Sequence, residues 1–407
     1  MRDTELLIPA SSLEVLKTAV LYGADAVYIG GELYGLRAKA KNFSMEDMAE
    51  GIAFAHDHGV KVYVTANIVA HNEDIPGIRT YFEELRDLGP DALIISDPGV
   101  FAMARLICPM IPVHISTQAN SSNYMTYNFW FKQGASRVVA ARELSIEELA
   151  FIRDHIPEEM EIEAFIHGAM CISHSGRCLL SSYFTGRDAN RGACTHPCRW
   201  KYYVVEESRP GEYIPVEENE RGTYLFNSKD LCMIEYIPEL LEAGIDSLKI
   251  EGRMKTALYV AAVARTYRRA IDDYKKSPEI YRSNMDYYRS EIAKCTYRPF
   301  TTGFYFGKTD EKAQIYDEST YIKEYTYIGI IQEVDENGYH KIYQRNKFST
   351  GEEIEVMVPD GTNKILPVLA MEDENRDPVE SAPHPKQEIW IKFSEELKPG
   401  WLLRRKD

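Results

Sequence analysis

The stretch GADAVYIGG, residues 23–31, shows a pattern that returns as GASRVVAARE at 134–143 and as AGIDSLKIEG at 243–252. Each copy has a glycine that ends a helix, then a short turn, then a buried strand. A chain made of such units alternates strands and helices around a mostly parallel sheet.

Working outward from these copies, we predict eight strands. They are residues 5–10, 26–30, 61–67, 92–97, 113–118, 137–141, 161–167 and 247–251. Most are followed by a segment with helical spacing, as at 45–58 and 146–155. This alternation predicts an α/β fold, a (β/α)8 TIM-like barrel. An open, doubly wound sheet is the alternative, but the count of eight favours the barrel.

A chain of 407 residues is too long for one ordinary core. We predict the barrel over 1–275, with a cysteine-rich insertion at about 168–245 after the seventh strand. A helical and extended connector follows over 276–320. Short alternating strands broken by turns then predict a small all-β domain, a β-barrel, over 321–407. Because barrel active sites lie at the carboxyl ends of the strands, the insertion is expected on the catalytic face.

The overall charge limits the partners that the chain can have. Lysine and arginine number 47 against 63 aspartate and glutamate residues, which gives a formal net charge of -16. Such a chain repels nucleic acid as a whole, so a nucleic-acid function requires a locally basic surface. Neither a signal peptide nor a membrane-spanning stretch is evident, and the expected compartment is the cytoplasm.

Five of the seven cysteines fall in the insertion, with the spacing C-x6-C-x15-C-x3-C-x33-C. They are Cys171, Cys178, Cys194, Cys198 and Cys232. In a reducing compartment this grouping favours metal ligands over disulfides, and iron–sulfur clusters are usually held by four thiolates. Zinc is the alternative metal, although only Cys194 and Cys198 have the close spacing of a zinc knuckle. Unrelated buried thiols are the remaining alternative.

Polar residues at or near the ends of the predicted strands mark a candidate site on the same face. We predict catalytic roles for His167, Arg142 and Glu251. We predict substrate contacts for Arg37, Lys39, Asn67, Gln118 and Arg253. Arginine suits a dicarboxylate because its guanidinium donates two parallel hydrogen bonds. Helix capping is the alternative role for polar residues at this edge, as for Asp97 before Pro98 and Ser145 before IEEL.

The insertion is also locally basic, with aromatic residues interleaved. We predict RNA-binding roles for Arg187, Arg191, Arg199 and Lys201, beside aromatic residues such as Phe184 and Trp200. Such a surface binds phosphates and stacks bases. Alternatively, these cations neutralise the thiolates or pair with carboxylates of the barrel.

The run E163-x-F-x-x-G-A-M-C171-x4-G-x-C178-x-L-S181 resembles the signature of the collagenase-like peptidase family, also called peptidase family U-32. The segments GADAVYIGG, NRGACTHPCRW and KIEGRMK are similar to that family too, as is RNKFSTGEEIEVMVPDG in the tail. The resemblance covers essentially the whole chain.

The resemblance implies hydroxylation rather than proteolysis. Members of this length with a β tail are similar to proteins of prephenate-dependent 5-hydroxylation of the wobble uridine in tRNA. It therefore implies a tRNA-modifying hydroxylase with tRNA, a small dicarboxylate such as prephenate, and a protein partner as expected partners. By matching motifs it implies a 4Fe-4S cluster on Cys171, Cys178, Cys194 and Cys232, with Cys198 as the alternative fourth ligand.

Two other functions stay open at this point. The family name implies a metal-dependent peptidase, but the chain has neither H-E-x-x-H nor G-x-S-x-G, and only Cys171 with His174 offers a nucleophile pair. A non-catalytic, metal-stapled tRNA-binding protein would have the same cysteines and basic surface but no pocket for a small dicarboxylate.

Overall fold

The structure is a computed structural model. It describes residues 3–35, 42–171, 174, 178, 180–187, 189–200, 203–204, 211, 214–215, 227–307, 314–315 and 322–407. The chain divides into two compact units. One comprises residues up to 16 with 25–255 and 298–320, and the other comprises 17–24, 256–297 and 321–407.

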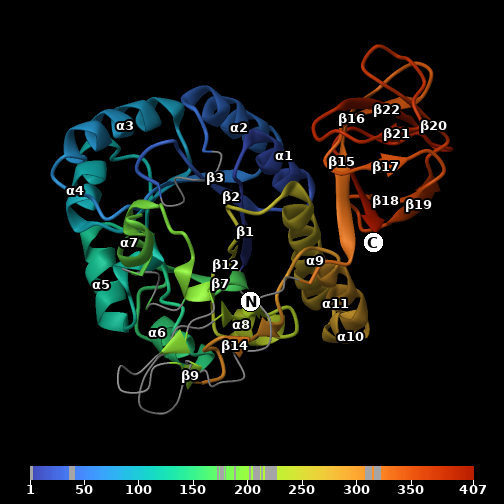
Figure 1. Ribbon diagram of the computed structural model, residues 1–407. Coiled ribbons are helices and arrows are strands. Elements are labelled where there is room, and N and C mark those ends of the chain that lie inside the picture. Colours follow the sequence, from blue (N-terminus) through green and yellow to red (C-terminus); the bar gives the residue numbers. More distant parts are fainter. Residues whose placement is uncertain are drawn as a thin grey trace. The chain divides into compact units, whose positions relative to one another are not determined.

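The first unit contains a closed barrel of eight parallel strands, as the repeated pattern predicts (Figure 1). The barrel strands are β1 (Glu5–Pro9), β2 (Ala26–Gly30), β3 (Lys61–Ala66), β4 (Ala92–Ile95), β5 (Val113–Ile115), β6 (Arg137–Val139), β7 (Glu161–Ala169) and β12 (Ser247–Ile250). Each pairs with the next in the chain, and β12 closes the ring by pairing with both β7 and β1. The prediction of a TIM-like barrel is therefore confirmed.

Helices surround the ring of strands in the first unit, as Figure 1 shows for α2 to α6. The helices of this alternation are α1 (Leu13–Leu21), α2 (Met45–Asp57), α3 (Ile75–Leu88), α4 (Pro98–Ile107), α5 (Tyr124–Gln133), α6 (Ile146–Asp154) and α8 (Ile237–Glu242). The glycines of the repeated pattern follow their helices in left-handed conformations, with φ of 102° at Gly23, 94° at Gly134 and 76° at Gly244.

Both predicted helix caps are present. The Asp97 carboxylate accepts hydrogen bonds from the amides of Gly99 and Val100 at the start of α4. The Ser145 hydroxyl accepts from the amide of Glu148, whose carboxylate accepts from the Ser145 amide in return. The capping alternative thus holds for these two residues, which fix helix starts near the mouth of the barrel.

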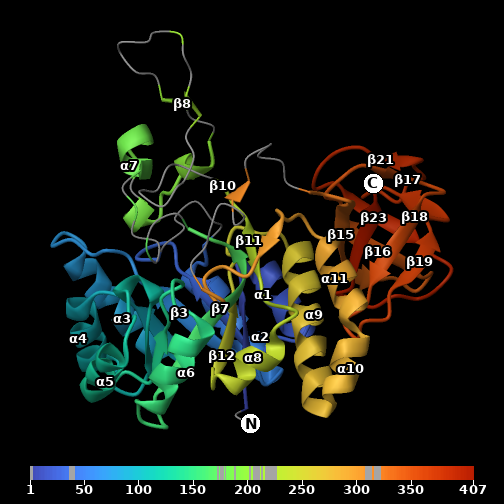
Figure 2. The same cartoon turned by 90° about the horizontal axis from the view of Figure 1, so that it is seen from below.

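The insertion after β7 lies at the end of the barrel opposite the start of β1 (Figure 2). Its described elements are α7 (Leu180–Thr185), β8 (Tyr203–Val204), β9 (Ile214–Pro215), β10 (Asn227–Ser228), β11 (Asp230–Cys232) and 3-10 turns at Ala189–Arg191 and Pro197–Arg199. Later strands of the same unit are β13 (Phe300–Thr301) and β14 (Gln314–Ile315), which pair with β11 and β10. Strand β7 is longer than its neighbours in the barrel, and its last residues pair with the antiparallel strand β11.

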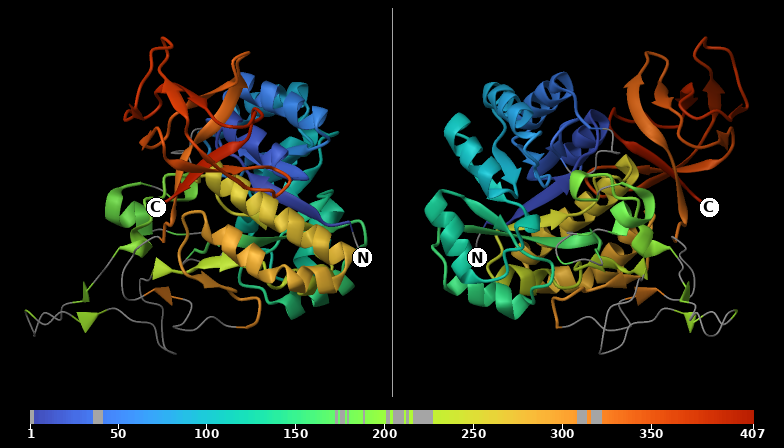
Figure 3. Two further views of the ribbon diagram at one scale, coloured as in Figure 1. Left: turned by 90° about the vertical axis from the view of Figure 1, so that its right-hand side faces the viewer. Right: turned by 60° about the vertical axis from the view of Figure 1, so that its left-hand side comes forward.

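The second unit joins three helices to an antiparallel β module, which Figure 3 shows in orange and red. The helices are α9 (Ala257–Lys276), α10 (Pro278–Ser283) and α11 (Met285–Ala293). Seven strands form its main sheet: β19 (Lys364–Pro367), β18 (Glu353–Met357), β23 (Leu402–Lys406), β15 (Tyr325–Val334), β16 (Tyr339–Tyr343), β22 (Glu388–Lys392) and β20 (Ala370–Glu372). The short strands β17 (Phe348–Ser349) and β21 (Ser381–Ala382) form a separate pair. The predicted C-terminal all-β domain is confirmed.

A buried ion cluster ties these helices to the sheet within the second unit. Arg404 of β23 is fully buried and lies 2.9 Å from Glu291 of α11 and 2.6 Å from Glu355 of β18. Arg265 of α9 lies 2.6 Å from the same Glu291. Burial alone would raise the pKa of Glu291, but the surrounding cations lower it to about 2. The carboxylate therefore stays ionised at neutral pH.

The barrel interior is held by a second buried network. Arg137 is 3% exposed and lies 2.7 Å from Glu5 and 3.1 Å from the fully buried Glu163. Lys249 lies 2.6 Å from the other oxygen of Glu163, and Tyr63 donates to Glu5 at 2.5 Å. Burial alone would raise the pKa of Glu5, but Arg137 holds it below its ordinary value of 4.5. This stabilisation is therefore present above about pH 4.5 and is lost as the pH falls below it.

Removing the cation at the centre of this network should destabilise the barrel. Arg137→Met leaves Glu163 with Lys249 alone and strips Glu5 of its cation, so we expect a loss of about 3–5 kcal/mol in the free energy of unfolding. Urea denaturation at pH 7, followed by circular dichroism, measures it. Arg86→Met is the control, because Arg86 is half exposed and pairs with exposed Asp87, and it should cost less than about 1 kcal/mol. Equal losses for both variants would contradict the role assigned to Arg137.

Candidate functional site

The carboxyl ends of the barrel strands bring most of the predicted site residues to one face, because parallel strands of a barrel all end there. Those within the described part of the chain are Asn67 after β3, Gln118 after β5, Arg142 after β6, His167 on β7, and Glu251 and Arg253 after β12. Arg37 and Lys39 lie outside the described residues.

Arg142 joins the ends of β7 and β12. Its Nη1 donates to the carbonyl oxygen of Ala169 at 3.0 Å, and its Nη2 lies 3.2 Å from the Glu251 carboxylate. Its guanidinium also lies over the Phe165 ring, 3.9 Å from the centroid. Arg142 and Glu251, both predicted to be catalytic, thus bind each other and fix the backbone that leads into Cys171.

Arg253 is buried on the opposite side of the β12 end. Its Nη1 donates to the Thr65 hydroxyl of β3 at 3.0 Å, and that hydroxyl donates to the carbonyl oxygen of Ile29 at 3.1 Å. Asn67 is also buried, and its amide donates to Ser116 while its carbonyl oxygen accepts from Ser96. These polar side chains link the ends of different strands, so hydrogen bonds fix the positions of the strand ends around the mouth of the barrel.

His167 lies at the point where β7 leaves the barrel. Its carbonyl oxygen accepts from the Glu251 amide at 2.8 Å, and it faces Cys232 in the antiparallel register of β7 with β11. Burial lowers the pKa of His167 to about 3, with Lys255 acting in the same direction. Its ring is therefore neutral at neutral pH, so it can serve only as a neutral donor or acceptor there.

Gly168 permits the close approach of the β7 and β12 ends. Its φ is 110°, and a Cβ atom on it would lie 2.4 Å from the carbonyl oxygen of Glu251. Only glycine accepts both the backbone conformation and the contact. The residue next to His167 thus sets the direction in which the chain proceeds to Cys171.

The five cysteines are all free thiols, and four of them are partly exposed while Cys178 is buried. The Sγ of Cys178 accepts a hydrogen bond from the amide of Leu180, and the Sγ of Cys194 accepts one from the amide of His196, both at 3.4 Å. Two cysteines from separate parts of the insertion thus have the same amide-to-sulfur arrangement. Hydrogen bonds to sulfur are among the interactions that tune iron–sulfur clusters.

Three hydroxyl side chains join the Cys178 and Cys194 segments. Ser181 is fully buried, and its hydroxyl accepts from the Thr195 amide at 3.0 Å. The Thr195 hydroxyl lies 3.0 Å from that of Ser181 and 3.1 Å from that of Thr185. Helix α7 and the segment around Cys194 are therefore held together by direct hydrogen bonds.

Asn190 links the insertion to the barrel within the first unit. Its carbonyl oxygen accepts from the Val69 amide, in the loop after β3, at 3.1 Å, and its side-chain amide donates to the carbonyl oxygen of Cys178 at 3.3 Å. Sequence reasoning did not select Asn190, Ser181 or Thr195 as site residues. The spacing of Ser181 and Thr185, four residues apart, is the one local signal that could have indicated a shared helix face.

The predicted RNA-binding surface is partly described. Phe184 and Trp200 are 42% and 48% exposed, with ring centroids 6.5 Å apart, and Arg187 is exposed nearby in the sequence. Exposed aromatic rings that lie close to one another offer a surface on which bases can stack. The side chains of Arg191 and Arg199, and all of Lys201, lie outside the part that the structure describes.

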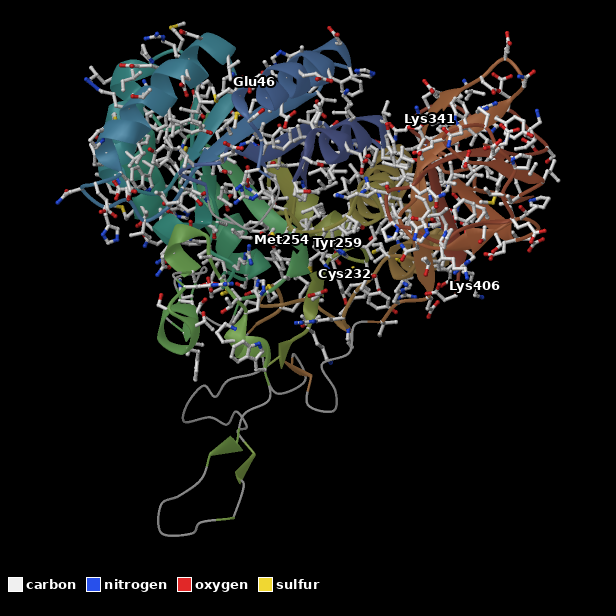
Figure 4. The ribbon with its side chains drawn as sticks, turned by 45° about the horizontal axis from the view of Figure 1, so that its top comes forward. Glu46, Cys232, Met254, Tyr259, Lys341 and Lys406 are labelled. Carbon is white, nitrogen blue, oxygen red and sulfur yellow. The ribbon has the colours of Figure 1, made fainter. Side chains whose placement is uncertain are left out.

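Over the described residues, no group of three or more His, Cys, Asp or Glu side chains is gathered closely enough to hold a single metal ion. A cluster of several iron atoms is a larger body than one ion, so its thiolates stand further apart. The donor set of Cys171, Cys178, Cys194 and Cys232 suits such a cluster in number and in ligand type. Figure 4 marks Cys232, on the strand that pairs with the end of β7.

A methyl group at Gly168 should disrupt the site. Gly168→Ala adds both a strained φ and an overlap with the Glu251 backbone, so we expect a loss of more than about 4 kcal/mol in unfolding free energy. Gly59→Ala is the matched control, because Gly59 has a φ of 73° but no atom within 4 Å of the added Cβ. It should cost only about 1–2 kcal/mol for the left-handed backbone. Thermal and urea unfolding of both variants measure the difference, and similar losses would show that the close contact is unimportant.

Comparison with known proteins places these features in a family. Residues 11–315 match Peptidase family U32, and residues 323–404 match the Peptidase family U32 C-terminal domain. The chain is 40% identical over 405 residues to tRNA hydroxylation protein P1 of Bacillus subtilis (strain 168), covering 99% of this chain and 95% of that protein.

Two Escherichia coli (strain K12) proteins are also similar. The tRNA hydroxylation protein P is 36% identical over 446 residues, covering 99% of this chain and 96% of that protein. The 23S rRNA 5-hydroxycytidine C2501 synthase is 37% identical over 268 residues, covering 66% of this chain and 39% of that protein. With family matches over both of its parts, the chain belongs to peptidase family U32.

Proposed function

We propose that this protein is an RNA-modifying enzyme that hydroxylates C5 of the wobble uridine in tRNA. The observation that carries this function is the similarity over 99% of the chain to two proteins named for tRNA hydroxylation. The similarity to a 5-hydroxycytidine synthase supports hydroxylation at a pyrimidine C5. No helix in the described part of the chain is long and apolar enough to cross a bilayer, and we propose that the protein acts in the cytoplasm.

The mouth of the barrel supports this chemistry. A buried base in RNA must leave its stack to reach a catalytic pocket, and bases outside a stack are recognised by hydrogen bonds and by aromatic stacking. The ring of polar side chains formed by Asn67, Gln118 and Arg253 supplies hydrogen-bonding groups at the strand ends. Phe184 and Trp200 supply exposed rings on the insertion above them.

We propose that Cys171, Cys178, Cys194 and Cys232 hold a 4Fe-4S cluster over this mouth. When bound, such a cluster would supply electron-transfer chemistry for the oxidation of C5–H to C5–OH, which removes two electrons and adds one oxygen atom. The chain's own residues position it: Arg142 holds the carbonyl of Ala169 before Cys171, and Ser181 and Thr195 hold the Cys178 and Cys194 segments together. Zinc at the same cysteines is the alternative metal.

We further propose that prephenate, or a related dicarboxylate, is the small-molecule donor that the hydroxylation reaction uses. Bidentate binding by arginine is the chemistry that favours a carboxylate ligand. Arg253 lies at the mouth in the described part of the chain, where its Nη1 donates to Thr65, and Arg142 is bound to Glu251 and Ala169. Arg37 is the remaining candidate for this role.

Loss of one buried cysteine should abolish the modification. We expect tRNA from a strain that lacks this gene to lose 5-hydroxyuridine derivatives, with recovery on expression of the wild type but not of Cys178→Ser. Cys108→Ser is the matched control, because Cys108 is a buried thiol that donates to the carbonyl oxygen of Phe82 outside the insertion. Mass spectrometry of digested tRNA measures the nucleosides. Unchanged 5-hydroxyuridine derivatives in a strain without redundant activities would contradict the function.

The fourth ligand is tested by counting iron. Cys232 lies within the pairing of β11 with β7, opposite His167, while Cys198 lies in a 3-10 turn of the insertion. We therefore expect Cys232→Ala to lose most of the iron from anaerobically purified protein and Cys198→Ala to keep it. The reverse pattern would assign Cys198 as the ligand. A colourless wild type that contains zinc and no iron would contradict the cluster itself, and gelatin cleavage by cluster-free protein would favour the peptidase alternative.

A further inference from the structure

A polar pocket lies in the second unit, where helix α9 meets a turn of the β module. Its volume is about 320 Å³. The residues that line it come from 21–23, from one face of α9 and from the turn 359–361, all within the second unit. Three arginines line it, Arg265, Arg268 and Arg269, which lie at positions i, i+3 and i+4 of α9 and so share one face.

Arg265 is the buried member of this group, at 3% exposure. Its Nη1 donates to the carbonyl oxygen of Val358 at 2.7 Å, and its Nη2 donates to Glu291 at 2.6 Å. Its Nε is buried and has no hydrogen-bond partner within the described residues. These hydrogen bonds thus hold the guanidinium in position, while its Nε–H has no acceptor within the described residues. A buried donor without an acceptor costs free energy of folding unless a bound molecule accepts its hydrogen bond.

The two outer arginines pair with acids one turn further along α9. Arg268 is 20% exposed and donates twice to the exposed carboxylate of Asp272, from Nε at 3.0 Å and from Nη2 at 2.5 Å. Arg269 is 41% exposed, with its Nε 3.6 Å from Asp273 and its guanidinium over the Tyr287 ring. Both acids are carboxylates on the same helix, and the oxygens of a phosphate group can displace them from the guanidinium groups.

The charge of this pocket differs from that of the chain. Its lining has three arginines against two carboxylates, Asp272 and Asp360, on a chain of net charge -16. Asp360 is engaged in its own turn, where it accepts from the amide and the hydroxyl of Thr362. The pocket therefore presents guanidinium groups to a ligand, and these match the oxygens of a phosphate group.

We propose, on the basis of the RNA function proposed above, that this pocket binds a backbone phosphate of the RNA substrate through Arg268 and Arg269. The buried guanidinium of Arg265, which also lines the pocket, adds a positive charge that attracts the phosphate. The pocket belongs to the second unit and the cysteine-bearing insertion to the first, and the pocket supplies affinity without reading sequence, as phosphate contacts do. Asp272 occupies Arg268 in the absence of RNA and gives it up when a phosphate is bound.

The test is the affinity of the full-length protein for tRNA at several salt concentrations, by fluorescence anisotropy. We expect the double variant Arg268→Ala/Arg269→Ala to weaken binding about tenfold and to reduce the slope of log K against log salt by about one to two. Asp272→Asn should change affinity in the opposite direction, tightening binding severalfold, because it releases Arg268. Arg282→Ala is the matched control: this arginine of α10 is 73% exposed and does not line the pocket, so its removal should leave both quantities unchanged.

The outcomes separate this site from the function it rests on. If the wild type binds no tRNA, the RNA function itself fails. If the wild type binds and hydroxylates tRNA while the double variant binds with unchanged affinity and salt slope, the phosphate site is wrong and the function stands. A loss in Asp272→Asn equal to that of the double variant would also overturn the site. If inorganic phosphate raises the melting temperature of the wild type but not of the double variant, and tRNA affinity is equal in both, the pocket binds a free phosphate and the RNA assignment is wrong.

Discussion

Strand β7 pairs with β6 and β12 inside the barrel and with β11 beyond it, and the cysteine-bearing region depends on that change of partners. Residues 161–167 complete the ring of parallel strands, as eight-stranded closure requires. The last residues of β7 continue past the ring, where Gly168 brings them against the Glu251 backbone and Arg142 binds Ala169. The same strand therefore closes the barrel, leads into Cys171 and pairs with β11, the strand that carries Cys232.

Charge is distributed so that fixed cations lie inside an acidic chain. Arg137 and Lys249 balance buried carboxylates in the barrel, and Arg404 and Arg265 do so in the second unit. These pairs hold structure, because removing one partner leaves an uncompensated buried charge. The arginines that remain exposed, such as Arg187 on the insertion and Arg269 on α9, are the ones that we propose contact RNA.

The sequence predicted the barrel well because buried parallel strands are short apolar runs with helix-ending glycines between them, as at 23–31 and 243–252. It predicted which residues would follow the strands, since the carboxyl ends of all eight strands meet at one face. It did not predict the pairing of Arg142 with Glu251, which are 109 positions apart, nor strand β11, whose three residues have no local signal. Both features arise only when the eight strands close into a barrel, and the local sequence around each residue contains no information on which distant residues then meet. The contacts of Arg142 with Ala169 and Glu251 show that it also holds the end of β7, while its catalytic role stays a prediction.

We propose that the cysteine region over the barrel mouth performs a hydroxylation of RNA. The most direct measurement incubates anaerobically purified, iron-loaded protein with tRNA that lacks the modification, adds prephenate, and analyses the wobble nucleoside by mass spectrometry. We expect a uridine that has gained one oxygen atom with the wild type and an unchanged uridine with Cys178→Ser. Unchanged tRNA with fully iron-loaded wild-type protein, in the presence of the donor and any required partner, would contradict it.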